Sequence, residues 1–147
     1  MELTLTSPAF ASGAAIPTIY TARGSSTSPP LTITGVPQKA KSLTLCMHDP
    51  NAPHGDFVHW ILWNIPVITT TIPQGSIPAG ALQGVTSTGK PGYVAPAPPT
   101  GTHNYVFNLY ALDTTLNLPN TTTRTDCMAA IHGHVLAQTS LIGTVTA

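Results

Sequence analysis

Four side chains that can exchange protons or hydrogen-bond to a ligand stand where apolar segments end: Asp49, His59, His103 and Tyr105. Imidazole and phenol groups can donate hydrogen bonds to anionic oxygens, and a carboxylate can orient an imidazole. Buried polar groups cost free energy unless they are paired, so we expect these four to bond to one another or to a ligand. For any single histidine a purely structural network is the more common outcome. The clustering of all four favours a binding site.

Strand alternation decides which of these side chains share a face. In the segment 57–65 it places Phe57, His59, Ile61 and Trp63 on one face and Val58, Trp60 and Leu62 on the other. It groups His103 with Tyr105, Phe107 and Leu109, and it sets Asp49 at the end of the row Leu43, Leu45 and Met47. The polar groups are therefore expected where apolar strand faces end.

The elements that must position these residues are short strands. Fifteen Pro and twelve Gly divide the chain into segments rich in Thr, Val, Ile and Tyr, which is typical of strands joined by turns. Candidate strands are 2–6, 31–34, 42–48, 58–65, 104–112 and 139–145, with a weaker one at 81–86. This pattern favours a mainly β domain, an antiparallel sandwich, over an α/β fold.

Two segments depart from the strand pattern. Residues 124–138 place apolar side chains at helical spacing behind a Thr123 cap, which predicts one amphipathic helix near the C-terminus. Residues 84–101 are so rich in Gly and Pro that no regular element is expected there. We expect this loop to form a shaped wall, with a cis X-Pro bond as one option.

Composition excludes several classes of function. Only 7% of residues are charged, against roughly a quarter in an average soluble protein. Five scattered Lys and Arg residues cannot form the basic stripe that nucleic acid or an anionic membrane requires. We expect one domain over residues 1–147, in the cytoplasm, with no signal peptide, no membrane insertion and two free, buried thiols at Cys46 and Cys127.

Ordered motifs give the chain a family resemblance. They are DPNAP at 49–53, HW at 59–60, NIP at 64–66, GY at 92–93, PAPPTGTHNY at 96–105 and LYALD at 109–113. LTSPAF at 5–10, SPPL at 28–31 and GVP at 35–37 extend the match toward the N-terminus. Together they resemble the phosphatidylethanolamine-binding protein family, also called the Raf kinase inhibitor-like family, in its bacterial and archaeal branch.

The resemblance implies a β-sandwich with one or two short helices and a non-catalytic pocket for phosphate, a phosphorylated head group or another small anion. By matched motif the pocket would use Asp49, His59, Pro98, Pro99, His103 and Tyr105, with Phe57 and Tyr93 nearby. Asp49 would orient and help protonate a histidine, so anion affinity is expected to weaken as pH rises. Three residues, Asn51, Ala95 and Ala97, stand where the family pattern has Asp, Gly and Cys, and Asn51 would make the pocket rim less acidic.

Rival functions remain open at this point. A zinc site is disfavoured because none of the histidines has a compact metal-ligand spacing, so we expect neither metal nor cofactor. A hydrolase would need Asp49 and His59 to activate Ser87, and no GxSxG motif is present. A regulator that inhibits a kinase or protease through the same pocket is the stronger alternative. A homodimer is a further expectation from the resemblance.

Overall fold

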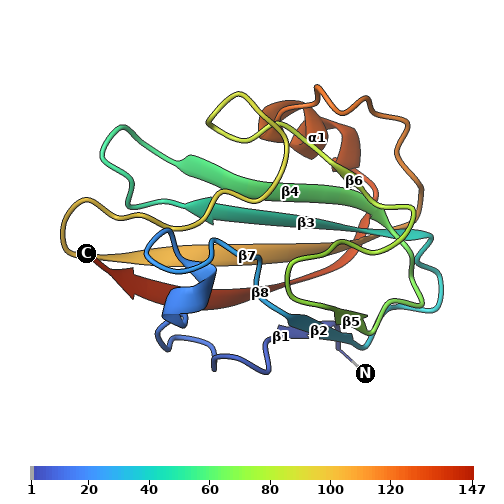
Figure 1. The fold of residues 1–147 in the computed structure, drawn as a ribbon. Coiled ribbons are helices and arrows are strands. Elements are labelled where there is room, and N and C mark those ends of the chain that lie inside the picture. The colour runs from blue at the N-terminus through green and yellow to red at the C-terminus, as the bar shows by residue number, and fades with distance from the viewer. Residues whose placement is uncertain (1) are drawn as a thin grey trace.

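Two antiparallel sheets form the framework of this computed structural model, which describes residues 2–147 (Figure 1). The larger sheet has the strand order β6 (Leu82–Gln83), β4 (Phe57–Ile65), β3 (Ser42–Asp49), β7 (Thr102–Leu112) and β8 (Val135–Thr146). The smaller one has the order β1 (Thr4–Thr6), β2 (Leu31–Thr34) and β5 (Thr71–Ile72). A 3-10 turn, η1 (Thr18–Tyr20), and one helix, α1 (Arg124–Ile131), complete the set. The predicted mainly β sandwich is confirmed.

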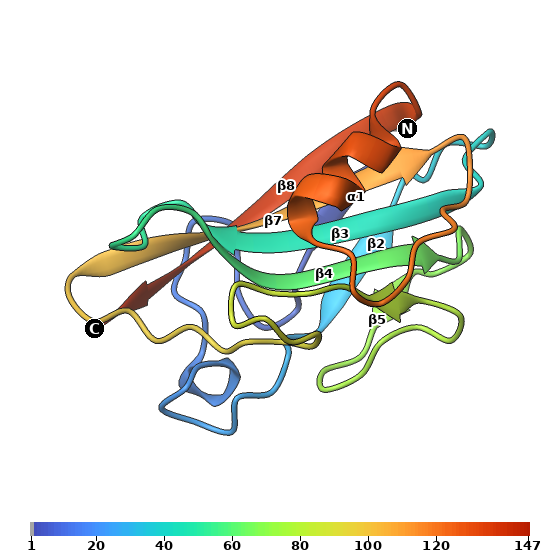
Figure 2. The same cartoon turned by 90° about the horizontal axis from the view of Figure 1, so that it is seen from above.

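The larger sheet has an apolar layer on each of its faces. One face packs against the small sheet, with Leu45 and Phe107 meeting Leu31 and Ile33 in the main core. The opposite face carries α1, and Ile61 and Trp63 pack there against Cys127 and Ile131 in a second cluster. Figure 2 shows α1 lying over the larger sheet. The side chains of β4 therefore divide between two apolar layers.

Strand β4 corrects the alternation that the sequence predicted. Across from β3, Trp60 pairs with Met47 and Val58 pairs with His48, so His59 is an extra residue at a β-bulge. A bulge turns two consecutive side chains toward the same face. His59 and Trp60 consequently both lie on the main-core side, whereas Ile61 and Trp63 lie under α1. The expectation that His59 shares a face with Ile61 and Trp63 was wrong.

The C-terminal helix is shorter than its apolar spacing predicted. The Thr123 side chain accepts a hydrogen bond from the Asp126 backbone N–H at 3.3 Å, as a helix cap does. The helix ends at Ile131, and Gly133 follows with φ at +83°, a left-handed conformation that favours glycine. Val135 begins β8 instead of continuing the helix. The prediction of a helix over 124–138 was therefore wrong beyond residue 131.

The Gly- and Pro-rich loop after β6 is held along the free edge of β4. Backbone N–H groups of Gly84, Ser87 and Val94 donate to carbonyls of β4, the last of them to His59 at 2.8 Å. The loop has no helix or strand of its own, as predicted, but no cis peptide bond occurs among residues 2–147. The suggested cis X-Pro bond is therefore absent from this wall.

Candidate functional site

A cavity of about 260 Å³ opens where β3, β4 and β7 end beside the Pro-rich loop. Its lining comprises Asp49, Ala52, Pro53, Phe57, His59, Val94, Ala95, Ala97, Pro98, Pro99, His103 and Tyr105. All the site residues predicted from the sequence except Tyr93 are among them. The cavity thus brings together side chains from four separate segments: the ends of β3 and β7, the bulged start of β4, and the Pro-rich loop.

Tyr93 lies outside this cavity. Its hydroxyl donates to the Tyr20 carbonyl at 2.7 Å, and its ring meets Trp60 edge-on with centroids 5.5 Å apart. Together with Trp60 it lines a separate, hydroxyl-rich hollow of about 440 Å³. Tyr93 supports the loop next to the cavity and does not line the cavity wall.

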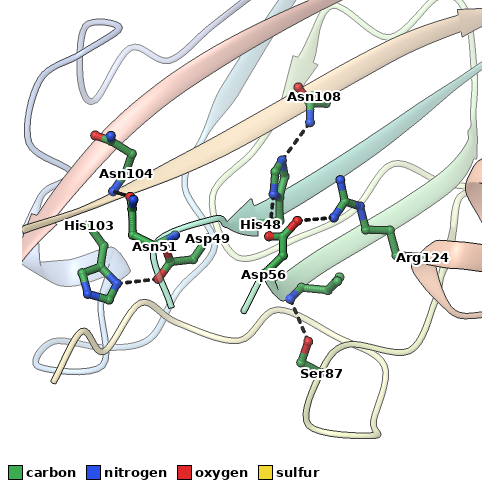
Figure 3. Close-up of polar contacts among 10 residues, drawn as sticks. His48, Asp49, Asn51, Asp56, Ser87, His103, Asn104, Asn108 and Arg124 are labelled. Atoms are coloured by element: carbon green, nitrogen blue, oxygen red, sulfur yellow. Dashed lines mark hydrogen bonds and ion pairs between the residues drawn. The ribbon is translucent and has the colours of Figure 1, made fainter. Parts of the chain in front are cut away.

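The centre of the cavity is a buried carboxylate–imidazole pair. Asp49 Oδ2 lies 2.6 Å from Nδ1 of His103, and because a carboxylate can only accept, Nδ1 carries the proton (Figure 3). The other carboxylate oxygen accepts from the Asn51 backbone N–H at 2.8 Å. Asp49 is 3% exposed and His103 is 7% exposed. This arrangement fixes the ring of His103 and leaves its Nε2 without a partner among residues 2–147.

Asn51 has a structural role beside this pair. Its side-chain oxygen accepts from the Asn104 backbone N–H at 2.9 Å, which ties the β3–β4 loop to the beginning of β7 (Figure 3). Asn51 does not line the cavity. The asparagine therefore holds the loop next to the Asp49 carboxylate, and its side chain is not part of the cavity wall.

His59 also donates through its Nδ1, but to a backbone carbonyl and not to a carboxylate. Its Nδ1 lies 2.6 Å from the Val94 carbonyl, which can only accept, so Nδ1 carries the proton and Nε2 is the free nitrogen. Burial lowers the pKa of His59 below its ordinary value, and the bond to Val94 and the nearby Asp49 charge oppose this only in part. The ring is therefore neutral near pH 7, with an accepting lone pair on Nε2.

This tautomer can be tested directly by NMR. We expect the His59 ring to titrate below the ordinary midpoint of about 6.5 and to carry its neutral-state proton on Nδ1. The unfolded chain takes up the proton more readily, so stability should fall as pH drops below about 6.5. Ring ¹⁵N shifts recorded against pH would show this. A midpoint above 6.5, or a proton on Nε2, would contradict the assignment.

Aromatic and apolar groups complete the wall. The Tyr105 ring meets His59 edge-on at 5.2 Å between centroids and stacks on His103 at 6.4 Å. Burial raises the pKa of Tyr105 above its ordinary value, and the charge of Asp49 adds to that shift. The phenol therefore stays protonated. Phe57 packs on His59, with ring centroids 4.7 Å apart.

A second carboxylate–histidine pair lies on the other face of the same strand. His48 precedes Asp49 and points the opposite way, where its Nδ1 bonds Asp56 at 2.8 Å (Figure 3). Arg124 donates to the other Asp56 oxygen at 2.6 Å. Burial alone would raise the pKa of Asp56, but the bonds from His48 and Arg124 outweigh it and lower that pKa.

The geometry of a serine hydrolase is not assembled around the cavity. Ser87 lies on the Asp56 side of β4, where its Oγ accepts from the Val58 backbone N–H at 2.8 Å. Asp49 bonds His103 and not His59. Within residues 2–147 no group of three or more His, Cys, Asp or Glu is placed to hold a metal ion. In the same range, no helix is long and apolar enough to cross a membrane.

Comparison with known proteins identifies the family. The family model described as "Phosphatidylethanolamine-binding protein" matches residues 6–146. The chain belongs to this family. It is 42% identical to a UPF0098 protein of Methanothermobacter thermautotrophicus, over 96% of this chain and 97% of that one. It is 40% identical to a candidate lipoprotein, LppC, of Mycobacterium tuberculosis, over 97% of this chain and 71% of that one.

Solved structures of the phosphatidylethanolamine-binding protein family share the fold. A homologue from Chlamydia trachomatis, CT736, superposes with a TM-score of 0.96 at 36% identity, covering 99% of this chain and 98% of that one. YbcL of E. coli, described as a member of the mammalian family, gives 0.92 at 27% identity, covering 100% and 99%. The resemblance that the motifs indicated is thereby confirmed.

Sequence reasoning about this family member missed part of the cavity. Val94 holds His59 through its backbone carbonyl, and no side-chain pattern indicates such a contact. Ala52 and Pro53 belong to the DPNAP motif, but small apolar residues carry no chemistry, so the motif itself indicates only Asp49 as a site residue. Their role is to shape the wall.

Proposed function

We propose that this protein binds small anions, such as phosphate or a phosphorylated head group, in the cavity around Asp49, His59 and His103, and that it carries out no chemistry on them. The observation that supports this most is the buried Asp49–His103 pair. It leaves Nε2 of a fixed imidazole at a cavity wall with no hydrogen-bond partner among residues 2–147. An N–H on that Nε2 can donate to an anionic oxygen, and hydrogen bonds to ionised acceptors are stronger than those between neutral groups.

The rest of the wall supports a ligand with an apolar part. Pro98, Pro99 and Phe57 line the cavity together with three alanines. Most small-molecule sites combine such apolar lining with a few fixed polar groups. The family description, which names a phospholipid, agrees with a phosphorylated ligand. A protein that carries or senses small anions would account for both the fixed imidazole and the apolar lining.

The test is an NMR titration of the histidine ring signals with phosphate and phosphoethanolamine. We expect saturable shifts of His59 and His103 in the wild type and their loss in His103→Ala. The matched control is His134→Ala, because His134 pairs with Asp113 at 2.8 Å in an exposed position away from the cavity. Unchanged ring signals in the wild type, or binding that survives His103→Ala, would refute the proposal.

Three other expectations remain predictions: inhibition of a kinase or protease through the same cavity, a homodimer, and a cytoplasmic location. A partner that phosphoethanolamine displaces would favour the regulatory role over simple binding.

A further inference from the structure

The charges around the cavity do not suit a doubly charged anion. None of the residues that line it is Lys or Arg. Its one carboxylate, Asp49, lies 2.6 Å from His103, so the pair is neutral in sum when His103 is protonated and negative when it is not. In neither state does the wall carry a net positive charge that would offset a phosphate dianion.

His59 adds a hydrogen-bond acceptor to this wall. Its only ring proton is engaged by the Val94 carbonyl, so Nε2 presents a lone pair. An ionised oxygen placed against that lone pair would meet repulsion, whereas a hydroxyl would find an acceptor. The titratable groups around His59 are Asp49, His103 and Tyr105 at the cavity and His48 on the other face of β3. Burial keeps the His59 ring neutral among them.

We propose that the cavity selects the singly protonated, monoanionic form of a phosphomonoester or phosphonate. This inference rests on the proposed function and specifies its ligand. One ionised oxygen accepts from Nε2 of a protonated His103, and the remaining P–OH donates to Nε2 of His59. The organic substituent lies against Pro98 and Phe57. The P–OH of the ligand thus supplies the hydrogen-bond donor that Nε2 of His59 lacks.

Two consequences distinguish this inference from simple anion binding. A phosphomonoester loses its last proton with a pKa of about 6, so its affinity should fall about tenfold for each pH unit above that value. A diester is a monoanion without P–OH, so it should bind about 10-fold or more weakly at every pH, because it leaves the His59 lone pair against an oxygen.

The experiment is calorimetry with three small probes between pH 5 and 8. They are methylphosphonate, difluoromethylphosphonate, whose fluorines lower the second pKa, and methyl methylphosphonate, which has the same charge as the monoanion but no P–OH. We expect affinity for difluoromethylphosphonate to begin falling at lower pH than affinity for methylphosphonate. We also expect methyl methylphosphonate to bind about 10-fold or more weakly at pH 5.

His59→Gln provides a second, independent test, because the glutamine amide can donate as well as accept. The variant should lose the discrimination against methyl methylphosphonate, and Asp56→Asn should retain it. If both phosphonates lose affinity at the same pH, the titrating group is on the protein and the inference is wrong while the proposed function stands. Equal affinity for all three probes would likewise refute the inference and leave the proposed function intact. If none of them binds, the proposed function itself fails.

Discussion

Asp49→Asn is expected to weaken methylphosphonate binding at pH 5 about 10- to 100-fold, although it removes a negative charge from the cavity. Simple Coulomb reasoning predicts the opposite sign for an anion. The side-chain oxygen of asparagine can still accept from His103 Nδ1, so the ring keeps its orientation. What is lost is the ionised acceptor at Nδ1, which polarises the ring and strengthens the hydrogen bond from Nε2 to the ligand.

The matched control for this change is Asp56→Asn. Asp56 also bonds a histidine of β3, but it lies on the face under α1 and does not line the cavity. Calorimetry should find its affinity for methylphosphonate within about twofold of wild type. Tighter binding by Asp49→Asn would show that the carboxylate acts only as an opposing charge. Equal loss in both variants would point to a general effect on the sheet.

Trp60→Ala, in the main core, is expected to lower the free energy of unfolding by about 3–5 kcal/mol. Trp60 is 1% exposed, its indole N–H donates to the Gln83 side chain at 3.0 Å, and its ring packs against Tyr93. Domains of this size are stable by about 5–15 kcal/mol, so the variant should unfold at much lower urea concentration. Urea unfolding followed by tryptophan fluorescence from Trp63 measures the loss.

Two controls separate packing from other causes. Ile68→Ala removes a side chain that is 85% exposed and should change stability by less than about 0.5 kcal/mol. Trp60→Phe keeps an aromatic ring but loses the bond to Gln83, so it should fall between Trp60→Ala and wild type. A loss below about 1 kcal/mol for Trp60→Ala would mean that the core closes over the gap.

The sequence predicted the site best where strands are regular. In β3 and β7 every second residue reaches the main core, so Asp49 and His103 were correctly expected at the ends of apolar rows. Their meeting could be expected because a polar group at each row end needs a partner. The partner of His59 could not be predicted, because a backbone carbonyl 35 residues away leaves no mark in the residue types.

Two local features account for the other errors. Val135 and Leu136 continue the helical spacing of α1, but glycine in a left-handed conformation at Gly133 ends the helix before them. Apolar residues on a strand can imitate helical periodicity over such a short span. Tyr93 has the residue type of a ligand contact, yet its hydroxyl is engaged by Tyr20. The backbone conformation at Gly133 decided the first case and a tertiary contact decided the second, and sequence spacing indicates neither.

Because of the bulge at His59, the fold depends more on the number of residues in β4 than on the identity of any one of them. Removing one residue between Phe57 and Trp60 would restore simple alternation and exchange the faces of every side chain on one side of the gap. His59 would then point toward α1, or Trp60 would leave the main core. A point substitution in this strand changes the contacts of one side chain. An insertion or deletion of one residue would misplace side chains of both the cavity and the main core. Homologues that keep the cavity should therefore align through β4 without gaps.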